Sequence, residues 1–268
     1  MDGHFIKMHG LGNDFVVIDA RVEPVAISSS SARAIADRRI GIGCDQLIVI
    51  EPSTTADVRM RIWNADGSEV ESCGNATRCV ASLLGQQSTI ETAGGLLIAH
   101  RDGNNITVDL PPPTFDWERI PLSYPMDTAA LPLAWDDLAN PMAVNVGNPH
   151  VVFFVPDADA IDLERLGPLI ESDVVFPERI NVNVAHITGP SSLRLRVWER
   201  GVGLTRACGT GACATAVAAI QSRRAGGPVT VDLDGGRLMI DWQTAGVIHM
   251  SGPATEVFRG TLDWAQFA

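Results

Sequence analysis

Hydrophobic and polar residues alternate with a period of two over much of the chain, in runs short enough to be β-strands. The run 58–63 shows this pattern well, because arginines at its second and fourth positions separate apolar residues. A strand of this kind buries one face and exposes the other. Runs of strand length predict strands at 5–8, 15–18, 47–50, 58–63, 89–92, 96–99 and 106–110, and again at 143–146, 151–155, 182–187, 193–198, 229–233, 237–242, 247–250 and 255–263.

Four segments are predicted to be helices instead. Residues 30–39 follow serines that can cap a helix, and residues 163–171 follow Asp162, another good N-cap residue. An apolar stretch begins at Gly74 and runs to about residue 84, and an alanine-rich stretch runs from Thr210 to about residue 223.

The chain contains an internal duplication. The sequence VRMRIWN at 58–64 aligns with LRLRVWE at 193–199, at an offset of 135 residues. Nine residues later each copy reaches Cys-Gly, at Cys73 and at Cys208, with no gap. Because duplicated halves usually sit about a pseudo-two-fold axis, we expect the two thiols to face one another across a cleft.

Proline and glycine residues mark where each copy ends. The three prolines at 111–113 cannot continue a strand ladder, residues 114–140 form a crossing segment, and Gly252-Pro253 ends the second copy. The strand-like segment 255–263 is expected to return to the first copy. The predicted domains are therefore 1–115 together with 254–268, carrying Cys73, and 116–253, carrying Cys208. The predicted class is α+β, with two pseudo-symmetric lobes, each a curved and mostly antiparallel sheet around a central helix.

Composition limits the classes of function. A hydrophobic content of 46% and a charged content of 19% are typical of a globular protein. The net charge of −12 argues against a nucleic-acid or anionic-membrane partner, since both need a basic surface. The sequence shows neither a secretory signal nor an apolar run long enough to span a membrane. Five cysteines in such a chain indicate reduced thiols and a cytoplasmic location.

The cysteine of each Cys-Gly pair lies directly before a predicted helix. A thiol there is near the positive end of the helix dipole, and we expect this position to lower its pKa toward neutrality. The first backbone N–H groups of the helices, at Gly74-Asn75 and Gly209-Thr210, are suited to holding a carboxylate. One element thus supplies a tuned thiol and an anion site.

The alternative is that a Cys-Gly pair is only a small buried residue beside a turn. We adopt that interpretation for Cys44, Cys79 and Cys213. Zinc binding is not expected, because no second Cys or His pair has the required spacing. For Cys73 and Cys208 a catalytic role is favoured, since both follow polar loops at helix starts.

The duplication also aligns polar residues that have no evident packing role. Glu199-Arg200 replaces Asn64-Ala65 and breaks the symmetry, as an asymmetric substrate would require: Arg200 suits a carboxylate and Glu199 an ammonium group. The competing interpretations are simple turns for the asparagines and an exposed ion pair for Glu199 and Arg200. The aligned pairs are Asn13 with Asn148, Gln46 with Asn181, and Asn64 with Glu199.

Seven motifs, taken in order, resemble those of the diaminopimelate epimerase family over nearly the whole chain. They are GLGNDF at 10–15, GCDQ at 43–46, NADG at 64–67, CGNATRC at 73–79, GNPH at 147–150, ERGVG at 199–203 and ACGTGAC at 207–213.

The resemblance implies a cofactor-independent epimerase that interconverts LL- and meso-2,6-diaminopimelate for lysine and peptidoglycan biosynthesis, acts on this small dicarboxylic amino acid, and forms a homodimer. It implies that Cys73 and Cys208 are the acid–base pair and that His150 and Glu199 have supporting roles. The implied substrate-binding residues are Asn13, Gln46, Asn64, Gly74, Asn75, Asn148, Asn181, Glu199, Arg200, Gly209 and Thr210.

Two other interpretations are open. A proline or hydroxyproline epimerase uses the same two-thiol chemistry but typically carries Cys-Gly-His, whereas this chain has Asn75 at the third position. A binding module could hold a dicarboxylic amino acid without turning it over. Exchange of the α-proton in deuterated water separates an enzyme from such a binder.

Overall fold

The computed structural model describes residues 2–71, 73–244 and 246–267. The chain forms two compact units, residues 1–108 with 252–268 (unit 1) and residues 109–251 (unit 2). The sequence analysis expected the boundaries at residues 115 and 253. These lie seven and two residues beyond the observed boundaries at 108 and 251.

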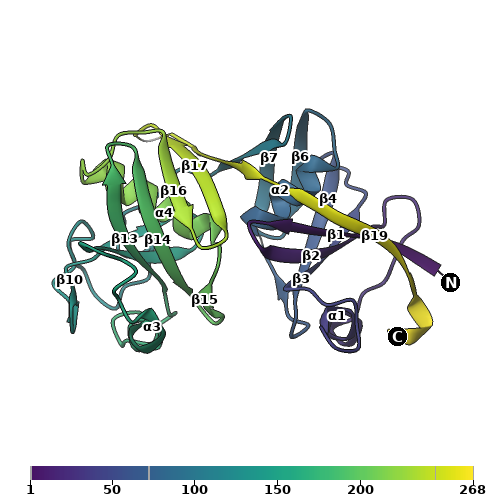
Figure 1. Cartoon of the computed structure of the whole chain (residues 1–268), viewed down its shortest axis with the longest axis horizontal. Helices are drawn as coiled ribbons and strands as arrows, with labels where there is room; N and C mark the ends of the chain where they lie inside the picture. The colour runs from purple at the N-terminus through teal and green to yellow at the C-terminus, as the bar shows by residue number, and fades with distance from the viewer. Residues whose placement is uncertain (1, 72, 245, 268) are drawn as a thin grey trace. The chain divides into compact units, whose positions relative to one another are not determined.

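Unit 1 is built on a twisted, mostly antiparallel ladder of strands (Figure 1). The order is set by an antiparallel β1–β2 hairpin, a parallel β2–β3 pair, an antiparallel β3–β4 pair, a parallel β4–β6 pair and an antiparallel β6–β7 hairpin. The strand bounds are β1 Asp2–Gly10, β2 Asn13–Asp19, β3 Gln46–Glu51, β4 Val58–Asn64, β5 Glu69–Val70, β6 Gln87–Thr92, β7 Gly95–Asp102, β8 Asn105–Leu110 and β19 Thr255–Asp263.

Unit 2 repeats this ladder with the same pairing directions. The register also repeats. Phe15 pairs with Gln46 in unit 1, and the residues 135 positions later, His150 and Asn181, pair in unit 2. The strand bounds are β9 Ala134–Trp135, β10 Leu138–Ala139, β11 Met142–Asn145, β12 Pro149–Phe154, β13 Asn181–Gly189, β14 Ser192–Glu199, β15 Gly203–Thr205, β16 Val229–Leu233, β17 Gly236–Trp242 and β18 Ile248–Pro253.

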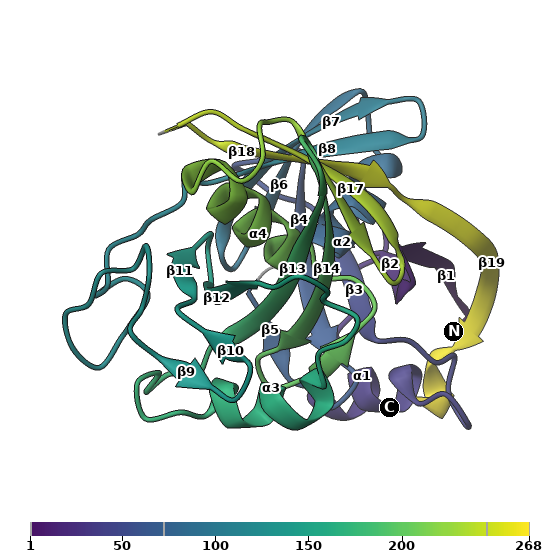
Figure 2. The same cartoon turned by 60° about the vertical axis from the view of Figure 1, so that its left-hand side comes forward.

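Each ladder curves around one central helix. In unit 1, α2 (Gly74–Ser82) contacts β1, β2, β6 and β7, and all of its residues from Asn75 to Ala81 are buried. In unit 2, α4 (Gly209–Gln221) contacts β11, β12, β13, β14, β16 and β17 and is buried from Ala212 to Ala219 (Figure 2). A helix that is apolar on every side must be enclosed, and its small alanine side chains let the strands approach closely.

A second helix covers the outside of each ladder. In unit 1, α1 (Ser29–Ala36) packs on β3 and β4, and in unit 2, α3 (Leu163–Glu171) packs on β13, β14 and β15. Ser28 and Asp162 cap these helices by accepting hydrogen bonds from the backbone N–H groups of Ser31 and Arg165.

The predicted α+β class, with two similar lobes that each wrap a sheet around a helix, is confirmed. The first helix is shorter than predicted and ends at Ala36, because Asp37 turns to an extended conformation and its side chain accepts from the backbone of Arg39. The short strands β5, β9, β10 and β15 were not predicted. None of the helices in the described part of the chain has the length and apolar character of a membrane span.

Replacing Gly167 by alanine is expected to destabilise unit 2. A Cβ at this position of α3 would lie 2.4 Å from Trp198 Cδ2, and the indole is held by a 2.7 Å hydrogen bond from its Nε1 to Glu171 Oε2. Overpacking should lower the free energy of unfolding by about 1–3 kcal/mol, which exceeds the stabilisation of about 1 kcal/mol from the better helix propensity of alanine. Urea unfolding measures the difference. Gly85→Ala is the control, because its Cβ meets nothing closer than 3.6 Å. An unchanged or higher stability for Gly167→Ala would contradict the packing argument.

Candidate active site

The polar residues predicted in unit 1 lie where neighbouring strands begin or end at one edge of the sheet. Asn13 and Gln46 begin β2 and β3, and Asn64 ends β4. Gln46 is the register partner of Asn64, and it also pairs with Phe15, two residues after Asn13. The curvature of the sheet around α2 therefore gathers these residues beside the helix start, where Cys73 is the N-cap residue.

Cys73 is partly exposed and contacts two of the predicted residues. Its Sγ donates to Asn13 Oδ1 over a long 3.9 Å, and Asn75 Nδ2 donates to the same oxygen at 3.2 Å. The carbonyl oxygen of Cys73 accepts from both the backbone N and the Oγ1 of Thr77, each at 2.9 Å. The start of α2 is thus held through the backbone while the thiol stays accessible.

The other end of the Asn13 amide is fixed by charged residues. Asn13 Nδ2 donates to Asp45 Oδ2 at 3.0 Å, and Arg38 bridges Asp45 and Asp14. Lys7 also donates to Asp14, at 2.5 Å, and to a backbone carbonyl. Burial alone would raise the pKa of Asp14, but the hydrogen bonds from Arg38 and Lys7 hold that pKa well below its usual range. Asp14 is therefore a permanent anion that anchors this network.

Gln46 presents an acceptor without a partner. Its Nε2 donates to Asn64 Oδ1 at 3.0 Å, and Asn64 Nδ2 donates to Ser68 Oγ at 3.2 Å. The Oε1 atom of Gln46 is buried and has no hydrogen-bond partner among the described residues. A buried acceptor left this way costs free energy, and a ligand N–H group would relieve that cost.

In unit 2, Cys208 occupies the matching position as the N-cap of α4. The backbone N–H of Gly211 donates to Cys208 Sγ at 3.4 Å, and Thr210 Oγ1 lies 3.6 Å from the same sulfur. The side chain is only 4% exposed. The first turn of α4 therefore places an N–H group and an O–H group within hydrogen-bonding distance of this sulfur.

The predicted lowering of the thiol pKa is wrong for Cys208 in this structure. Burial raises the pKa of Cys208 well above its usual range, and the negative charge of Glu199 raises it further. The bonds from Thr210 and Gly211 act in the lowering direction but are outweighed. A helix start lowers a thiol pKa only where water or positive charge also favours the thiolate, and here the carboxylate opposes it.

The three cysteines assigned to packing are all buried. Burial raises the pKa of Cys44 to about 11 and that of Cys79 to about 12. The thiols of Cys44 and Cys79 therefore stay protonated at neutral pH.

His150 is a buried neutral base that orients Asn148. Its Nε2 is 2.9 Å from Asn148 Oδ1 and its Nδ1 is 3.0 Å from Asn183 Nδ2, while Asn183 Nδ2 also donates to Val151 O. Because Asn183 donates to Nδ1, the ring proton lies on Nε2 and is donated to Asn148. Burial lowers the pKa of His150 to about 3, so this tautomer stays neutral. Phe15 and Ile48 occupy the matching positions of unit 1.

Asn181 joins two loops of unit 2. Its Nδ2 donates to Pro149 O at 2.8 Å, and its Oδ1 accepts from the backbone N of Arg200 at 2.9 Å. The exposed Arg200 side chain donates to Glu178 O at 3.1 Å. The loop after β14 is also held by Glu171, whose Oε1 accepts from the backbone N of Gly201 at 2.9 Å. Asn181 therefore acts in this structure as a brace for the loop that carries Glu199 and Arg200.

The structure thus brings the predicted residues into two half-sites, one in each unit. Asn13, Gln46, Asn64, Cys73, Gly74 and Asn75 belong to the first, and Asn148, His150, Asn181, Glu199, Arg200, Cys208, Gly209 and Thr210 belong to the second.

Several supporting residues were missed by the sequence analysis. Asp14, Asp45 and Arg78 lie inside motifs that it singled out, but only the neighbouring residues received roles. Asn183 was assigned only to a predicted strand. Its position between two valines, where a polar side chain is unusual, was a signal that could have identified it. In the described ranges no three His, Cys, Asp or Glu side chains are arranged to hold a metal ion.

The fold is shared with several solved structures of enzymes and predicted enzymes. A hydroxyproline epimerase from Agrobacterium vitis aligns with a TM-score of 0.66 at 13% identity, covering 97% of this chain and 92% of its own. A PhzF-family phenazine biosynthesis protein from Bacillus anthracis aligns with a TM-score of 0.69 at 17% identity, covering 98% and 99%. These similarities show that the two-unit fold of this chain is shared with both proteins.

Sequence relatives identify the family of this chain. The family model described as diaminopimelate epimerase matches residues 5–115 and 142–257. A diaminopimelate epimerase of Sphingopyxis alaskensis is 63% identical over 267 residues, covering 100% of both chains. Another from Rhizorhabdus wittichii is 61% identical over 268 residues, covering 100% of this chain and 98% of its own. The chain belongs to the diaminopimelate epimerase family.

The buried His150–Asn183 pair should make stability depend on pH. The folded-state pKa of His150 is about 3 and the unfolded value is 6.5, so the unfolded state binds more protons between these values and stability falls as the pH is lowered. The contribution approaches about 1.4 kcal/mol per pH unit. We expect His150→Phe/Asn183→Ile, which copies the pair of unit 1, to lose stability less steeply from pH 6.5 to pH 4 in urea titrations.

Replacement of the exposed Val22 by alanine is the control and should leave the pH dependence unchanged, because neither side chain is ionisable. Equal slopes for the double variant and the wild type would show that His150 is not a neutral buried base.

Proposed function

We propose that the chain interconverts LL- and meso-2,6-diaminopimelate by moving the proton at one α-carbon, without pyridoxal phosphate, in the synthesis of lysine and peptidoglycan precursors. The observation that carries the proposal is the repeated N-cap cysteine. In a chain of this family, each copy of the duplicated fold places a cysteine at the first turn of its enclosed helix.

The substrate is proposed to bind through groups that the two half-sites present. The first N–H groups of α2 and α4, at Gly74-Asn75 and Gly209-Thr210, would hold the reacting carboxylate. The buried Gln46 Oε1 would accept from an ammonium group. Arg200 and Glu199 would hold the carboxylate and ammonium of the distant amino-acid centre, which proline does not have.

Proton transfer is proposed to use the two sulfurs on opposite faces of the α-carbon. Cys73 as thiolate takes the α-proton, and the electron pair of the C–H bond moves into the carboxylate as an ene-diolate. Cys208 as thiol then gives its proton to the opposite face and becomes the thiolate. The raised pKa of Cys208 supports its role as the initial proton donor. The reverse reaction exchanges the roles, so the two protonation constants belong to the pair.

The negative charge of the ene-diolate must be stabilised by the protein. The N–H groups at the starts of α2 and α4 would point at the ene-diolate oxygen that carries this charge. Because they are already oriented, they stabilise the charge without reorganisation. Both sulfurs must lie about 3–3.5 Å from the carbon for the transfer, which requires the two units to enclose the substrate and exclude water.

We expect Cys73→Ala and Cys208→Ala each to lower epimerisation of LL-diaminopimelate about a thousandfold, since each removes one proton-transfer group. Deuterium incorporation at the α-carbon in deuterated water measures the reaction, with proline as the alternative substrate. Cys44→Ala should keep wild-type activity, because its buried thiol takes no part. Near-native turnover by either single variant would exclude the two-base scheme. Binding without any exchange in the wild type would indicate a binding protein, and exchange into proline would indicate the rival epimerase.

The remaining proposals concern assembly and location. We propose that the lobes 1–115 with 254–268 and 116–253 act as the two catalytic domains, that the chain forms a homodimer, and that it is cytoplasmic. Light scattering coupled to size exclusion should then give twice the chain mass of 28.6 kDa. A mass of one chain at micromolar concentration would contradict the dimer.

A further inference from the structure

Arg78 is the largest fully buried side chain among the described residues, with 0% exposure. It lies on α2, one turn after Asn75, in a helix whose residues from Asn75 to Ala81 are all buried. Burying a guanidinium is costly unless its donors are satisfied, so a position like this calls for a specific role.

The contacts of Arg78 lead toward Cys73. Its Nη2 donates to Asn75 Oδ1 at 2.8 Å, and its Nε donates to Pro253 O at 3.4 Å. A Cβ on Gly10 would come within 3.1 Å of Arg78 Nη2 and 3.3 Å of Asn75 Cβ, so the glycine at the end of β1 leaves room for this pair.

Asn75 continues the chain of hydrogen bonds to Asn13. With its Oδ1 taken by Arg78, Asn75 must turn its Nδ2 toward Asn13 Oδ1, which lies 3.2 Å away. Asn13 in turn donates through Nδ2 to Asp45 Oδ2. A guanidinium only donates and a carboxylate only accepts, so the charged ends dictate the direction of both amides.

We propose that Arg78 is a positioning residue for the Cys73 half-site, acting through Asn75 and Asn13 to fix which atoms face the thiol. The proposal rests on the proposed function of Cys73 and deepens it. With this direction, Asn13 Oδ1 receives a hydrogen bond from Asn75 and so competes less for the Cys73 S–H, which favours the thiolate. Position 213, which matches Arg78 in unit 2, is a buried cysteine, so the support is particular to Cys73.

The test compares alkylation and turnover in Arg78 variants. Iodoacetamide alkylation at pH 7, followed for each cysteine by peptide mass spectrometry, should be about three- to tenfold slower at Cys73 in Arg78→Met, because Asn75 is no longer held in the direction that occupies Asn13 Oδ1. In the same variant kcat should fall about tenfold, with KM within about threefold, because the loss is at the reacting group. Arg78→Lys, which keeps the charge and a donor, should restore both readouts to within about twofold.

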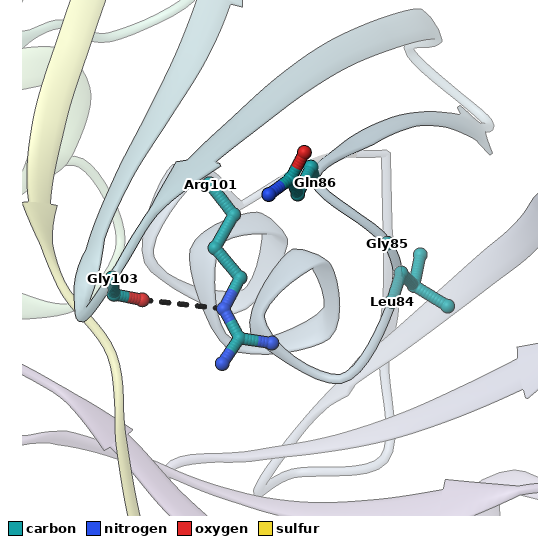
Figure 3. A pocket seen from close by; sticks show the side chains of 5 residues that line it. All are labelled: Leu84, Gly85, Gln86, Arg101 and Gly103. Carbon is teal, nitrogen blue, oxygen red and sulfur yellow. Dashed lines mark hydrogen bonds between the residues drawn. The ribbon is translucent and has the colours of Figure 1, made fainter.

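Arg101→Met is the matched control. Arg101 also contacts α2, but at its other end, where Nη1 donates to Ser82 O at 2.9 Å and Nε donates to Gly103 O at 3.2 Å. It lines a pocket of about 390 Å³ with Leu84, Gly85, Gln86 and Gly103 (Figure 3). Its loss should lower the melting temperature while leaving Cys73 alkylation and kcat within about twofold of wild type.

A folded Arg78→Met variant that alkylates at the wild-type rate would overturn the proposal, as would an equal loss in Arg101→Met. If Arg78→Met does not fold, Arg78→Gln is the deciding variant, because a neutral amide no longer fixes the direction of the hydrogen bonds through Asn75 and Asn13. An unchanged rate of Cys73 alkylation in that variant would also overturn the proposal. Failure of the proposed function can be distinguished from failure of the Arg78 proposal. If the wild type does not epimerise, the alkylation rates of Cys73 in the wild type and the Arg78 variants can still be compared.

Discussion

The structure depends on the enclosure of a helix by a sheet. In each unit the strands surround the central helix so fully that its body contacts only protein, and the backbone groups of the body are satisfied within the helix. The first turn is different, because its N–H groups have no intrahelical acceptor. These donors must be met at the sheet edge, where the strands end. The half-sites occur at that place because it is the part of the enclosed helix that still requires a partner.

The fold was largely predictable because duplication, alternation and apolar helices are local or repeated patterns. The sequence pattern located the strand of Arg59 and Arg61, the helix after Asp162 and the position of Cys73 and Cys208. Supporting contacts were not predictable, since Arg78 and Asn183 act through residues brought close only by strand pairing and helix packing. The pKa of Cys208 was mispredicted for a similar reason: the sequence shows the helix start, but burial and the direction of Glu199 are properties of the packed unit.

The two half-sites share a backbone plan and differ in what supports it. In unit 1 the asparagine beside the cysteine is set by charged residues, Asp45 at one end and Arg78 through Asn75 at the other. In unit 2 the equivalent Asn148 is set by a neutral histidine. Cys73 is partly exposed, whereas Cys208 is buried beside a carboxylate. After duplication the copies thus kept their register and diverged in polarity, so the two equivalent thiols lie in different electrostatic surroundings.

The pairing of β1 with β19, with Asp2 opposite Asp263, completes unit 1 from two segments that lie far apart in the sequence. Unit 2, in contrast, is one continuous stretch between those segments. The strand β19 is made only after residues 109–251, so the sheet of unit 1 has an unfilled edge while every strand of unit 2 is already present. Unit 1 therefore closes through contacts of much larger sequence separation, which cost more loop entropy than the contacts that close unit 2.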